Sequence, residues 1–397
     1  MTHRPLGLGL IGLGLAGGVM AAAARTHPGV QLVGAAEPSP ELRRRFEAGE
    51  GLPTYADIDG LLTRPEVDAV YVATPHQLHR EHTLAAAAAG KHVIVEKPMA
   101  LDAAHCDEMI AAAAAAGTML VVGHTHGFDP AVLVIRDLVA SGSYGPLGMV
   151  ALWNYTDFLY RPRRPEELDS ARGGGILYNQ VPHQIDVART IAAQPVRAVR
   201  AVASVLDPAR PVEGACAALV EFADHGAASL VYSGYDHFDS DELHGWVAEG
   251  GGRRSPAHGS ARRALRGMSA SAEARARARH LGYGARPAVP PAHQPHFGEL
   301  VVTCAHADFR CGTDEVTAYT ERGVERVAVP GRPWWPGRGD VLQELVDAVV
   351  HGRPAFHDGS FGRETVRTAL AIAQSARERR EVLLDPREVT APHERVH

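Results

Sequence analysis

Short apolar runs and longer amphipathic stretches alternate through the first 123 residues of the chain. Runs that are apolar at nearly every position predict strands buried on both faces, and the stretches between them predict helices. The predicted strands cover residues 6–11, 31–36, 67–73, 91–96 and 118–123, and the helices cover 19–25, 79–89 and 102–116. This order predicts an α/β fold, with a doubly wound parallel sheet covered by helices on both sides.

The pattern changes after residue 123, where apolar and polar positions begin to alternate within the strands. Alternation with a period of two predicts strands that bury one face only. We predict such strands at residues 148–157, 196–205, 215–222, 227–235, 300–304 and 324–329, and helices at 130–141, 173–193, 340–351 and 362–380. The second half is therefore expected to be α+β, an open and largely antiparallel sheet with helices on one face. We place the domain boundary between residues 1–127 and 128–397.

Composition narrows the class of protein. A length of 397 residues suits two domains, and a formal net charge of -6 argues against a general nucleic-acid binder. The four cysteines lie far apart without a CxxC pair, which favours reduced thiols over a zinc knuckle or a disulfide framework. No apolar run is long enough to span a membrane, and residues 6–11 are too short for a secretory leader. We expect a cytoplasmic protein.

Residues 253–286 carry nine arginines and a single acid, Glu273, among alanine, glycine and serine. Such a segment can serve as a lid or as a contact for a polyanion. An insertion of exposed helix and loop explains the composition more simply, and we favour it over residues 253–296.

A glycine motif follows the first predicted strand and opens the first predicted helix. The motif reads GLGLAG from Gly12 to Gly17. In this context it is typical of a Rossmann dinucleotide site, where the first glycine allows a tight turn, the second lets a pyrophosphate approach and the third lets the helix pack closely. The expected contacts of the cofactor here are Gly12, Gly14, Leu15, Ala16 and Gly17.

The acid at the end of the second strand bears on the choice of cofactor. Glu37 lies twenty residues beyond Gly17, where a carboxylate accepts hydrogen bonds from the adenosine ribose and repels a 2′-phosphate. NAD is therefore expected. Arg43, Arg44 and Arg45 on the next helix keep NADP as the alternative, although a solvated helix face explains them more simply.

Two further loops open on the same edge of the predicted sheet. The first, Thr74-Pro75-His76-Gln77-Leu78-His79, follows the fourth strand, and the second begins with Glu96 and Lys97, where Pro98 ends the fifth strand. Only two of the 40 basic residues are lysines. A lysine kept in so arginine-rich a chain indicates a need for an ammonium group that can lose its proton. Lys97 is therefore a catalytic candidate, and we add Thr74, Pro75, His76, His79, Glu96 and Lys97 to the cofactor contacts.

The second stretch with chemical potential is Gly173 to Asp186, which reads GGGILYNQVPHQID. Asn179 and His183 are four residues apart and share a face if the stretch is helical. Pro182 fits only a first helical turn, so a helix either begins near Val181 or is kinked there. Beside a nucleotide fold and Lys97, His183 is the best general-base candidate, and we name Lys97, His183 and Asn179 as the catalytic set.

Together these motifs resemble the Gfo/Idh/MocA oxidoreductase family: GLGLAG, ATPHQLH at Ala73, EKP at Glu96, GHTHGFDP at Gly123 and GGGILYNQVPHQID at Gly173. The resemblance implies a Rossmann domain joined to an open antiparallel sheet that carries the substrate and builds a homodimer or homotetramer. It also implies that Lys97 is catalytic. Asn179 stands where the family usually has an aspartate, and Thr125-His126-Gly127 replaces the family's usual arginine or asparagine cluster.

Within this family, YNQVPHQID and the later His296-Phe297-Gly298 look most like the phthalate dihydrodiol dehydrogenases of aromatic degradation. Residues 153–164 combine aromatic side chains with three arginines, as a flat ring bearing carboxylates requires. The same arginines can equally decorate a loop. The expected substrate contacts are His124, His126, Tyr155, Arg161, Arg163, Arg164, Arg172, Asn179 and His183.

We therefore predict an NAD-dependent dehydrogenase that oxidises a ring hydroxyl of a small cyclic substrate, with a carboxylated cis-dihydrodiol as the first choice. His183 or Lys97 would take the hydroxyl proton. The alternatives are a sugar, an inositol or a carboxylated semialdehyde hemiacetal as substrate, or a nucleotide-binding regulatory protein without turnover. A metal hydrolase built on His124, His126 and His183 lacks a neighbouring carboxylate to complete its site, and we expect no metal.

Overall fold

The computed structural model describes residues 4–284 and 291–385 of the chain. Its first sheet has six parallel strands in the order β3-β2-β1-β4-β5-β6, which confirms the predicted doubly wound fold. The strands are β1 Leu6–Ile11, β2 Val30–Ala36, β3 Thr54–Tyr55, β4 Ala69–Val72, β5 His92–Val95 and β6 Leu120–Val122. The helices are α1 Leu15–Thr26, α2 Pro40–Glu50, α3 Ile58–Leu62, α4 His79–Ala88 and α5 Ala103–Ala116.

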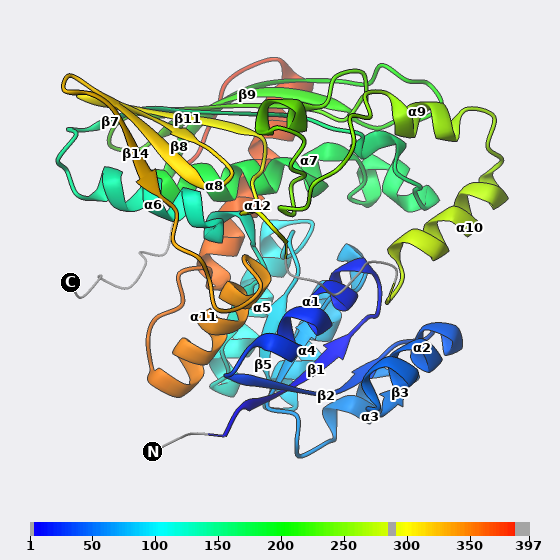
Figure 1. Cartoon of the computed structure of the whole chain (residues 1–397). Helices are drawn as coiled ribbons and strands as arrows, with labels where there is room; N and C mark the ends of the chain where they lie inside the picture. Colours follow the sequence, from blue (N-terminus) through cyan, green and yellow to red (C-terminus); the bar gives the residue numbers. More distant parts are fainter. Residues whose placement is uncertain (1–3, 285–290, 386–397) are drawn as a thin grey trace.

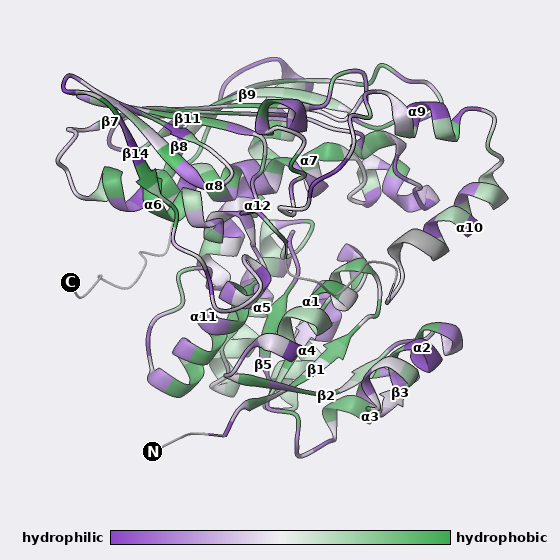
Figure 2. Cartoon of the chain, in the orientation of Figure 1, coloured by the Kyte–Doolittle hydropathy of each residue, from purple (hydrophilic) through white to green (hydrophobic). Residues whose placement is uncertain are grey.

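Local signals explain where these helices begin and end. The Ser39 hydroxyl caps α2 at the Leu42 N–H, and Pro40 occupies its first turn. Asp102 caps α5 in the same way at the His105 N–H (2.8 Å). Gly117 ends α5 in the left-handed conformation, with φ of 66°. Figure 2 shows the contrast between hydrophobic β1 and β5 in the centre and the mostly hydrophilic α2 at the surface.

The second sheet has nine strands in the order β14-β13-β12-β11-β7-β10-β9-β8-β15. Only the β7–β10 pair is parallel, so the sheet is largely antiparallel, as predicted. The strands are β7 Leu147–Tyr155, β8 Val196–Ser204, β9 Ala215–Phe222, β10 Ala227–Ser233, β11 Glu299–Cys304, β12 Ala307–Cys311, β13 Glu315–Thr320, β14 Gly323–Ala328 and β15 Val382–Leu383. Strands β3, β12, β13 and β15 were not predicted.

Helices cover one face of this sheet, so that they lie between the two sheets (Figure 1). They are α6 Pro130–Ala140, α8 Val181–Ala192 and the long α12 Gly359–Glu378, which packs on β8 and also on α5 of the first half. The prediction of one helix over residues 173–193 was wrong, and the alternative of a helix that begins near Val181 is confirmed. The chain forms α7 Gly175–Asn179 and then α8, because Pro182 occupies the first turn of a new helix.

The chain returns to the first sheet near its end. Helix α11, Arg338–His351, packs on α1, and its Val341, Leu342 and Leu345 join the apolar core formed with β1. The arginine-rich segment forms two helices, α9 Ser260–Leu265 and α10 Ala270–Leu281. Residues 285–290 of the predicted insertion lie outside the described residues. Among the helices of residues 4–284 and 291–385, none combines the length and apolar character that crossing a membrane requires.

Candidate active site

The glycine turn between β1 and α1 has the shape that a dinucleotide requires. Gly12 has φ of +99°, and a Cβ there would lie 2.8 Å from the Ala73 carbonyl oxygen. A Cβ on Gly17 would lie 2.1 Å from the Gly12 oxygen, so only glycine allows α1 to pack this closely. The Cβ direction of Gly14, by contrast, faces open space, and no side chain caps α1. Space for a pyrophosphate and free N–H groups at Leu15 and Ala16 therefore fit an NAD-type cofactor.

Glu37 lies buried at the carboxyl end of β2. Its Oε2 accepts a hydrogen bond from the Leu13 N–H (2.8 Å) and its Oε1 from the Ser39 N–H (3.0 Å). A carboxylate has about four lone-pair sites, so both oxygens keep capacity for ribose hydroxyls. The Arg43 guanidinium donates to the Glu37 backbone oxygen at 2.7 Å, which brings one of the three neighbouring arginines to this end of the site.

The Thr74–His79 loop lies beside this turn, and His79 is the most buried of its side chains. The two ring nitrogens of His79 contact the backbone oxygens of Pro98 (2.9 Å) and Thr74 (3.0 Å). His79 therefore links the loop after β4 to the loop after β5, and its ring has no nitrogen left for a cofactor. His76 is half-buried, and burial lowers its pKa to about 3. Thr74 donates to or accepts from His82 (3.1 Å).

Lys97 and Glu96 end β5 in different settings. The Lys97 ammonium donates to the backbone oxygen of Asn179 (2.6 Å), across the boundary between the two halves. Burial lowers the pKa of Lys97 to about 8; the charges of Arg338 and Arg163 lower it further, and Glu96 and Glu249 oppose the shift. Glu96 is fully engaged: it forms an ion pair with Arg338 and accepts hydrogen bonds from the Tyr71 hydroxyl and from the Lys97 N–H (3.1 Å).

His183 lies opposite Lys97 in an aromatic pocket. Its ring packs on His126 (4.8 Å between centroids) and on Phe297 (4.9 Å). Burial, reinforced by the charge of Lys97, holds the pKa of His183 well below its usual range, so the ring is neutral. His126 is different: burial opposes its protonation, but Asp129 at 2.8 Å outweighs burial and raises the pKa of His126.

Asn179 forms hydrogen bonds with backbone groups of the glycine loop. Its side-chain amide donates to the backbone oxygens of Gly173 (3.1 Å) and Gly175 (2.8 Å), and its backbone oxygen accepts from the Lys97 ammonium. The glycine loop is thereby fixed against the Rossmann half, where the Gln77 amide also donates to the Arg172 oxygen (2.5 Å).

Behind His183 lies a buried polar network. Neither ring nitrogen of His124 has a hydrogen-bond partner among the described residues, and burial lowers the pKa of the ring to about 4. The adjacent Asp186 accepts from the Gly127 N–H (2.7 Å) and from His357 (3.1 Å). The His124 ring therefore lies beside Asp186, with Nδ1 4.0 Å from the carboxylate.

The three arginines predicted to bind the substrate differ in how many of their hydrogen-bond donors are already engaged. Arg161 pairs with Asp157 (2.7 Å), and Arg163 donates to the Phe158 oxygen (2.6 Å) while its guanidinium lies over the Phe158 ring. Arg164 forms ion pairs with Glu166 and Glu167 through Nε (3.2 and 3.5 Å), and no hydrogen bond from its terminal nitrogens is described. Tyr155 packs edge-on against Trp153 (6.2 Å) and Phe238 (5.7 Å).

The sequence analysis did not identify three residues that affect the charges in the site: Arg338, Asp129 and Glu249. Arg338 reaches Glu96 over 242 residues of chain, and no local pattern signals such a contact. Asp129 is visible only as the residue before Pro130. No group of three or more histidine, cysteine, aspartate or glutamate side chains within residues 4–284 and 291–385 is arranged to hold a metal ion.

Sequence comparison adds two profile matches. Residues 6–124 match the oxidoreductase family with an NAD-binding Rossmann fold that is designated GFO/IDH/MocA, and residues 132–247 match the C-terminal domain of the same family. The chain is 38% identical over 380 residues to the 1-carboxy-3-chloro-3,4-dihydroxycyclohexa-1,5-diene dehydrogenase of Comamonas testosteroni, covering 93% of this chain and 94% of the relative.

Two other similarities define the range. A crystal structure of a protein from Bordetella bronchiseptica RB50 superimposes with a TM-score of 0.92 at 45% identity, covering 96% of this chain and all of that one. The myo-inositol 2-dehydrogenase of Thermotoga maritima is 31% identical over 201 residues, half of this chain and 58% of the relative. The sequence similarity to this inositol dehydrogenase is therefore partial, whereas the first two similarities run nearly the whole length.

Proposed function

This chain belongs to the Gfo/Idh/MocA family of NAD-binding oxidoreductases, and from that premise we propose that it oxidises a ring hydroxyl of a carboxylated cis-dihydrodiol to give the carboxylated catechol. The single observation that carries the proposal is the full-length similarity to a dehydrogenase whose named substrate is a carboxylated dihydroxycyclohexadiene. Such a step belongs to the degradation of aromatic acids. The aromatic pocket of His126, His183 and Phe297 suits a flat ring.

We assign the proton transfer to Lys97. Bound NAD supplies the acceptor for the hydride that leaves the carbinol carbon. Lys97, with a pKa of about 8, accepts the hydroxyl proton once its amine is unprotonated, whereas burial holds the pKa of His183 well below its usual range and makes the ring a weaker base. His183 then orients the hydroxyl by a hydrogen bond. The ketone that forms tautomerises to the aromatic catechol, which makes oxidation the favoured direction.

Glu37 supports NAD over NADP as the cofactor. A 2′-phosphate would meet a buried carboxylate that already fixes the glycine turn through Leu13. Arg43 is engaged with the backbone oxygens of Glu37 and Pro38 and does not offset that repulsion. We expect Glu37→Ala to lower the ratio of kcat/KM with NAD to kcat/KM with NADP.

We place the substrate carboxylate at Arg164. No described residue accepts a hydrogen bond from its terminal nitrogens, and its charge acts on His76 at the edge of the Rossmann half. Arg161 and Arg163 are engaged elsewhere and shape the wall. Arg172, exposed and without a described side-chain contact, is the second candidate.

We also propose that residues 1–127 bind the cofactor and that residues 128–397 bind the substrate and build a homodimer or homotetramer through the second sheet. Apolar side chains are exposed on its strands, among them Met149, Val202, Leu219, Tyr319, Val324 and Leu383. These residues support an interface on the face without helices. All four cysteines are free, which supports the expectation of a cytoplasmic enzyme.

A substrate panel tests the proposal. NADH formation would be followed with carboxylated and uncarboxylated cis-dihydrodiols, aldoses and inositols at equal concentration. We expect the carboxylated dihydrodiol to give the highest kcat/KM. A higher value for a sugar or an inositol would refute the proposed substrate class and leave the family assignment in place.

A further inference from the structure

We propose that Glu249 binds the hydroxyl of the diol that is not oxidised, and that it thereby sets which way round the substrate ring enters the site. This inference rests on the proposed function, because it assigns a residue to the second hydroxyl of that substrate. Glu249 lies on a loop of the second half, between β10 and α9, and it takes no part in the motifs discussed above.

The first argument is the position of the carboxylate. Glu249 raises the pKa of Lys97, which comes from the opposite half, and it likewise favours protonation of His126. The side chain is 24% exposed, so it is neither buried out of reach nor free in solvent. The backbone of Glu249 also bonds His296, the neighbour of Phe297 in the aromatic pocket, so Glu249 is an acid of the second half whose charge acts on both the proton acceptor and that pocket.

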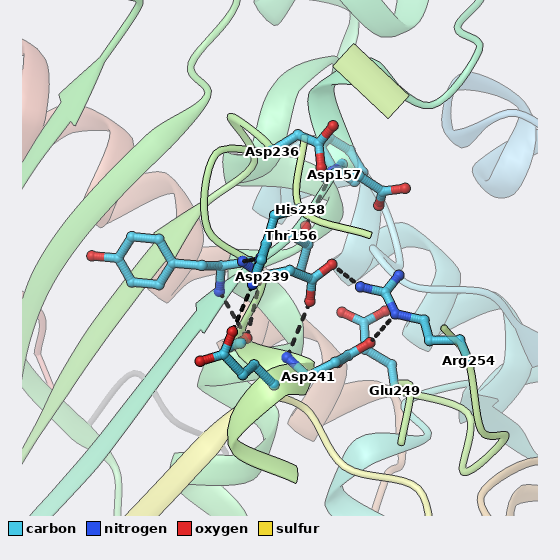
Figure 3. Close-up of polar contacts among 12 residues, drawn as sticks. Thr156, Asp157, Asp236, Asp239, Asp241, Glu249, Arg254 and His258 are labelled. Atoms are coloured by element: carbon cyan, nitrogen blue, oxygen red, sulfur yellow. Dashed lines mark hydrogen bonds and ion pairs between the residues drawn. The ribbon is translucent and has the colours of Figure 1, made fainter. Parts of the chain in front are cut away.

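The second argument is that the neighbouring acids form close ion pairs, whereas the ion pair of Glu249 is long. Figure 3 shows Asp239 and Asp241 both turned towards the Arg254 guanidinium, which forms an ion pair with each of them. Asp157 is paired with Arg161 at 2.7 Å. The nearest cation described for Glu249 is the Nη2 of Arg161, 3.8 Å from Oε2, and no described residue donates a hydrogen bond to that oxygen. Oε2 therefore keeps its capacity to accept one.

The third argument is that the carboxylate is held in place. Asn154 is fully buried on β7; its amide donates to Oε1 of Glu249 (3.1 Å), and its own oxygen accepts from the Ser240 hydroxyl (2.7 Å). The His296 N–H donates to the Glu249 backbone oxygen at 3.1 Å. A carboxylate fixed at one oxygen and open at the other is preorganised to accept a hydroxyl proton without loss of side-chain entropy.

The charge and the acceptor oxygens of Glu249 determine which group of the substrate it can bind. A carboxylate accepts hydrogen bonds from hydroxyls and repels another carboxylate. With Lys97 at the reacting hydroxyl, the neighbouring hydroxyl of a cis-diol lies towards Glu249, and the ring carboxylate turns away, towards Arg164. Specificity for a diol and the orientation of the ring follow from the same side chain.

The test compares Glu249→Gln with Glu242→Gln, a matched control on the same loop, where the side chain is 50% exposed and pairs with His258. KM and kcat would be measured with the carboxylated cis-dihydrodiol and with a ring alcohol that lacks the second hydroxyl. Glu249→Gln should raise KM for the diol about tenfold or more, the worth of one charge-assisted hydrogen bond. It should leave KM for the single alcohol and the affinity for NAD, measured by protein fluorescence, unchanged. Glu242→Gln should behave as wild type.

A pH profile adds a result that a purely structural role would not give. Because Glu249 raises the pKa of Lys97, its neutralisation should move the midpoint of kcat/KM to lower pH. A KM for the diol within twofold of wild type overturns the inference, and so does an equal loss with the single alcohol. If the wild type prefers another vicinal diol over the carboxylated dihydrodiol, the proposed substrate class fails, and Glu249 is judged by the same comparison on that diol.

Discussion

At the scale of single residues, Lys97 owes its chemistry to its surroundings. Burial lowers the pKa of its ammonium group to about 8; Glu96 and Glu249 supply negative charge, and Arg338 and Arg163 supply positive charge. A base must be unprotonated to accept the substrate proton. We therefore expect kcat/KM for oxidation to rise with pH through about 8 and to level off above it.

Lys97→Arg should lower kcat about 100-fold or more and remove that pH dependence, because guanidinium stays protonated. The chain offers a matched control in its other lysine. Lys91 donates to the backbone oxygens of Arg64 and Val67 on the Rossmann surface, and Lys91→Arg should keep near-normal turnover. Full activity in Lys97→Arg would reduce Lys97 to a structural residue and move the proton transfer to His183.

Recognition of the ring carboxylate gives a second prediction. Arg164→Gln should weaken kcat/KM for a carboxylated dihydrodiol about tenfold or more, because one charge-assisted hydrogen bond is lost, and should spare the uncarboxylated counterpart. Steady-state kinetics with the two substrates measure this preference, and Arg136→Gln on α6 serves as a surface control. If Arg172→Gln loses the preference while Arg164→Gln keeps it, the carboxylate site lies at the edge of the glycine loop.

The sequence identified those site residues that neighbouring residues in the chain make recognisable. The rarity of lysine identified Lys97 before any contact was known, and the glycine spacing identified the dinucleotide turn. The partners of these residues come from distant segments: Arg338 pairs with Glu96, and Glu249 acts on Lys97 from a loop 152 positions further along the chain. No periodicity or spacing encodes such pairs, because they depend on how the two halves pack.

At the scale of elements, α10 and the residues after it connect the two halves. Glu273 forms a two-fold ion pair with Arg210 (2.8 and 2.9 Å) and accepts from the Arg163 N–H (2.7 Å). At the other end, the Tyr283 N–H donates to the Leu13 oxygen (3.0 Å) within the glycine turn, and the Tyr283 ring packs edge-on against Phe46. Figure 1 shows α10 descending from the second half towards α1 and α2.

Tyr283→Ala keeps the backbone hydrogen bond to Leu13 but removes the ring that packs on Phe46 and holds this segment against the glycine turn. NAD binding should therefore weaken about fivefold, which corresponds to roughly 1 kcal/mol. Fluorescence titration with NAD measures the affinity. Arg275→Ala, on the exposed face of the preceding helix α10, is the control and should bind as wild type. Unchanged NAD affinity in Tyr283→Ala would contradict a role of this segment in cofactor binding, and residues 253–284 would then be an exposed insertion, as their composition predicts.

The elements that sequence predicted best are those with strong periodicity. The five predicted strands of the first sheet and the six predicted strands of the second were placed to within about two residues, because apolar runs and alternation are encoded locally. Strands β12 and β13 were missed: each is short, and the residues between them, Gly312 to Asp314, also suit a single loop. Docking of Tyr283 on the turn could not be predicted, since it joins segments about 270 positions apart.

At the scale of the whole molecule, a buried ion network joins the halves. His357 contacts Asp186 of α8 (3.1 Å) and Glu344 of α11 (3.3 Å), and these acids outweigh burial and raise the pKa of His357 to about 9. The nearby His124 ring, 6.0 Å away between centroids, has its pKa lowered to about 4 and is neutral. The charged His357 therefore stabilises the arrangement of the two halves.

A raised folded-state pKa fixes the sign of the pH effect. The stabilisation is fully present below the unfolded pKa of 6.5 and is lost as pH rises through about 9, and the shift corresponds to roughly 3 kcal/mol. His357→Gln should lower the free energy of unfolding in urea at pH 6, and the difference from wild type should shrink at pH 10. His225→Gln, on the surface, should show no such difference. A gap that stays constant with pH would contradict the network's role.

The central claim is that this family member removes a hydride from the ring carbon of a carboxylated cis-dihydrodiol. The most direct measurement uses such a diol with deuterium on both carbinol carbons, incubated with NAD and the purified protein. Mass spectrometry should find one deuterium in the NADH and an equal amount of carboxylated catechol. Failure to form NADH from this diol, while a sugar or an inositol forms it, would contradict the account.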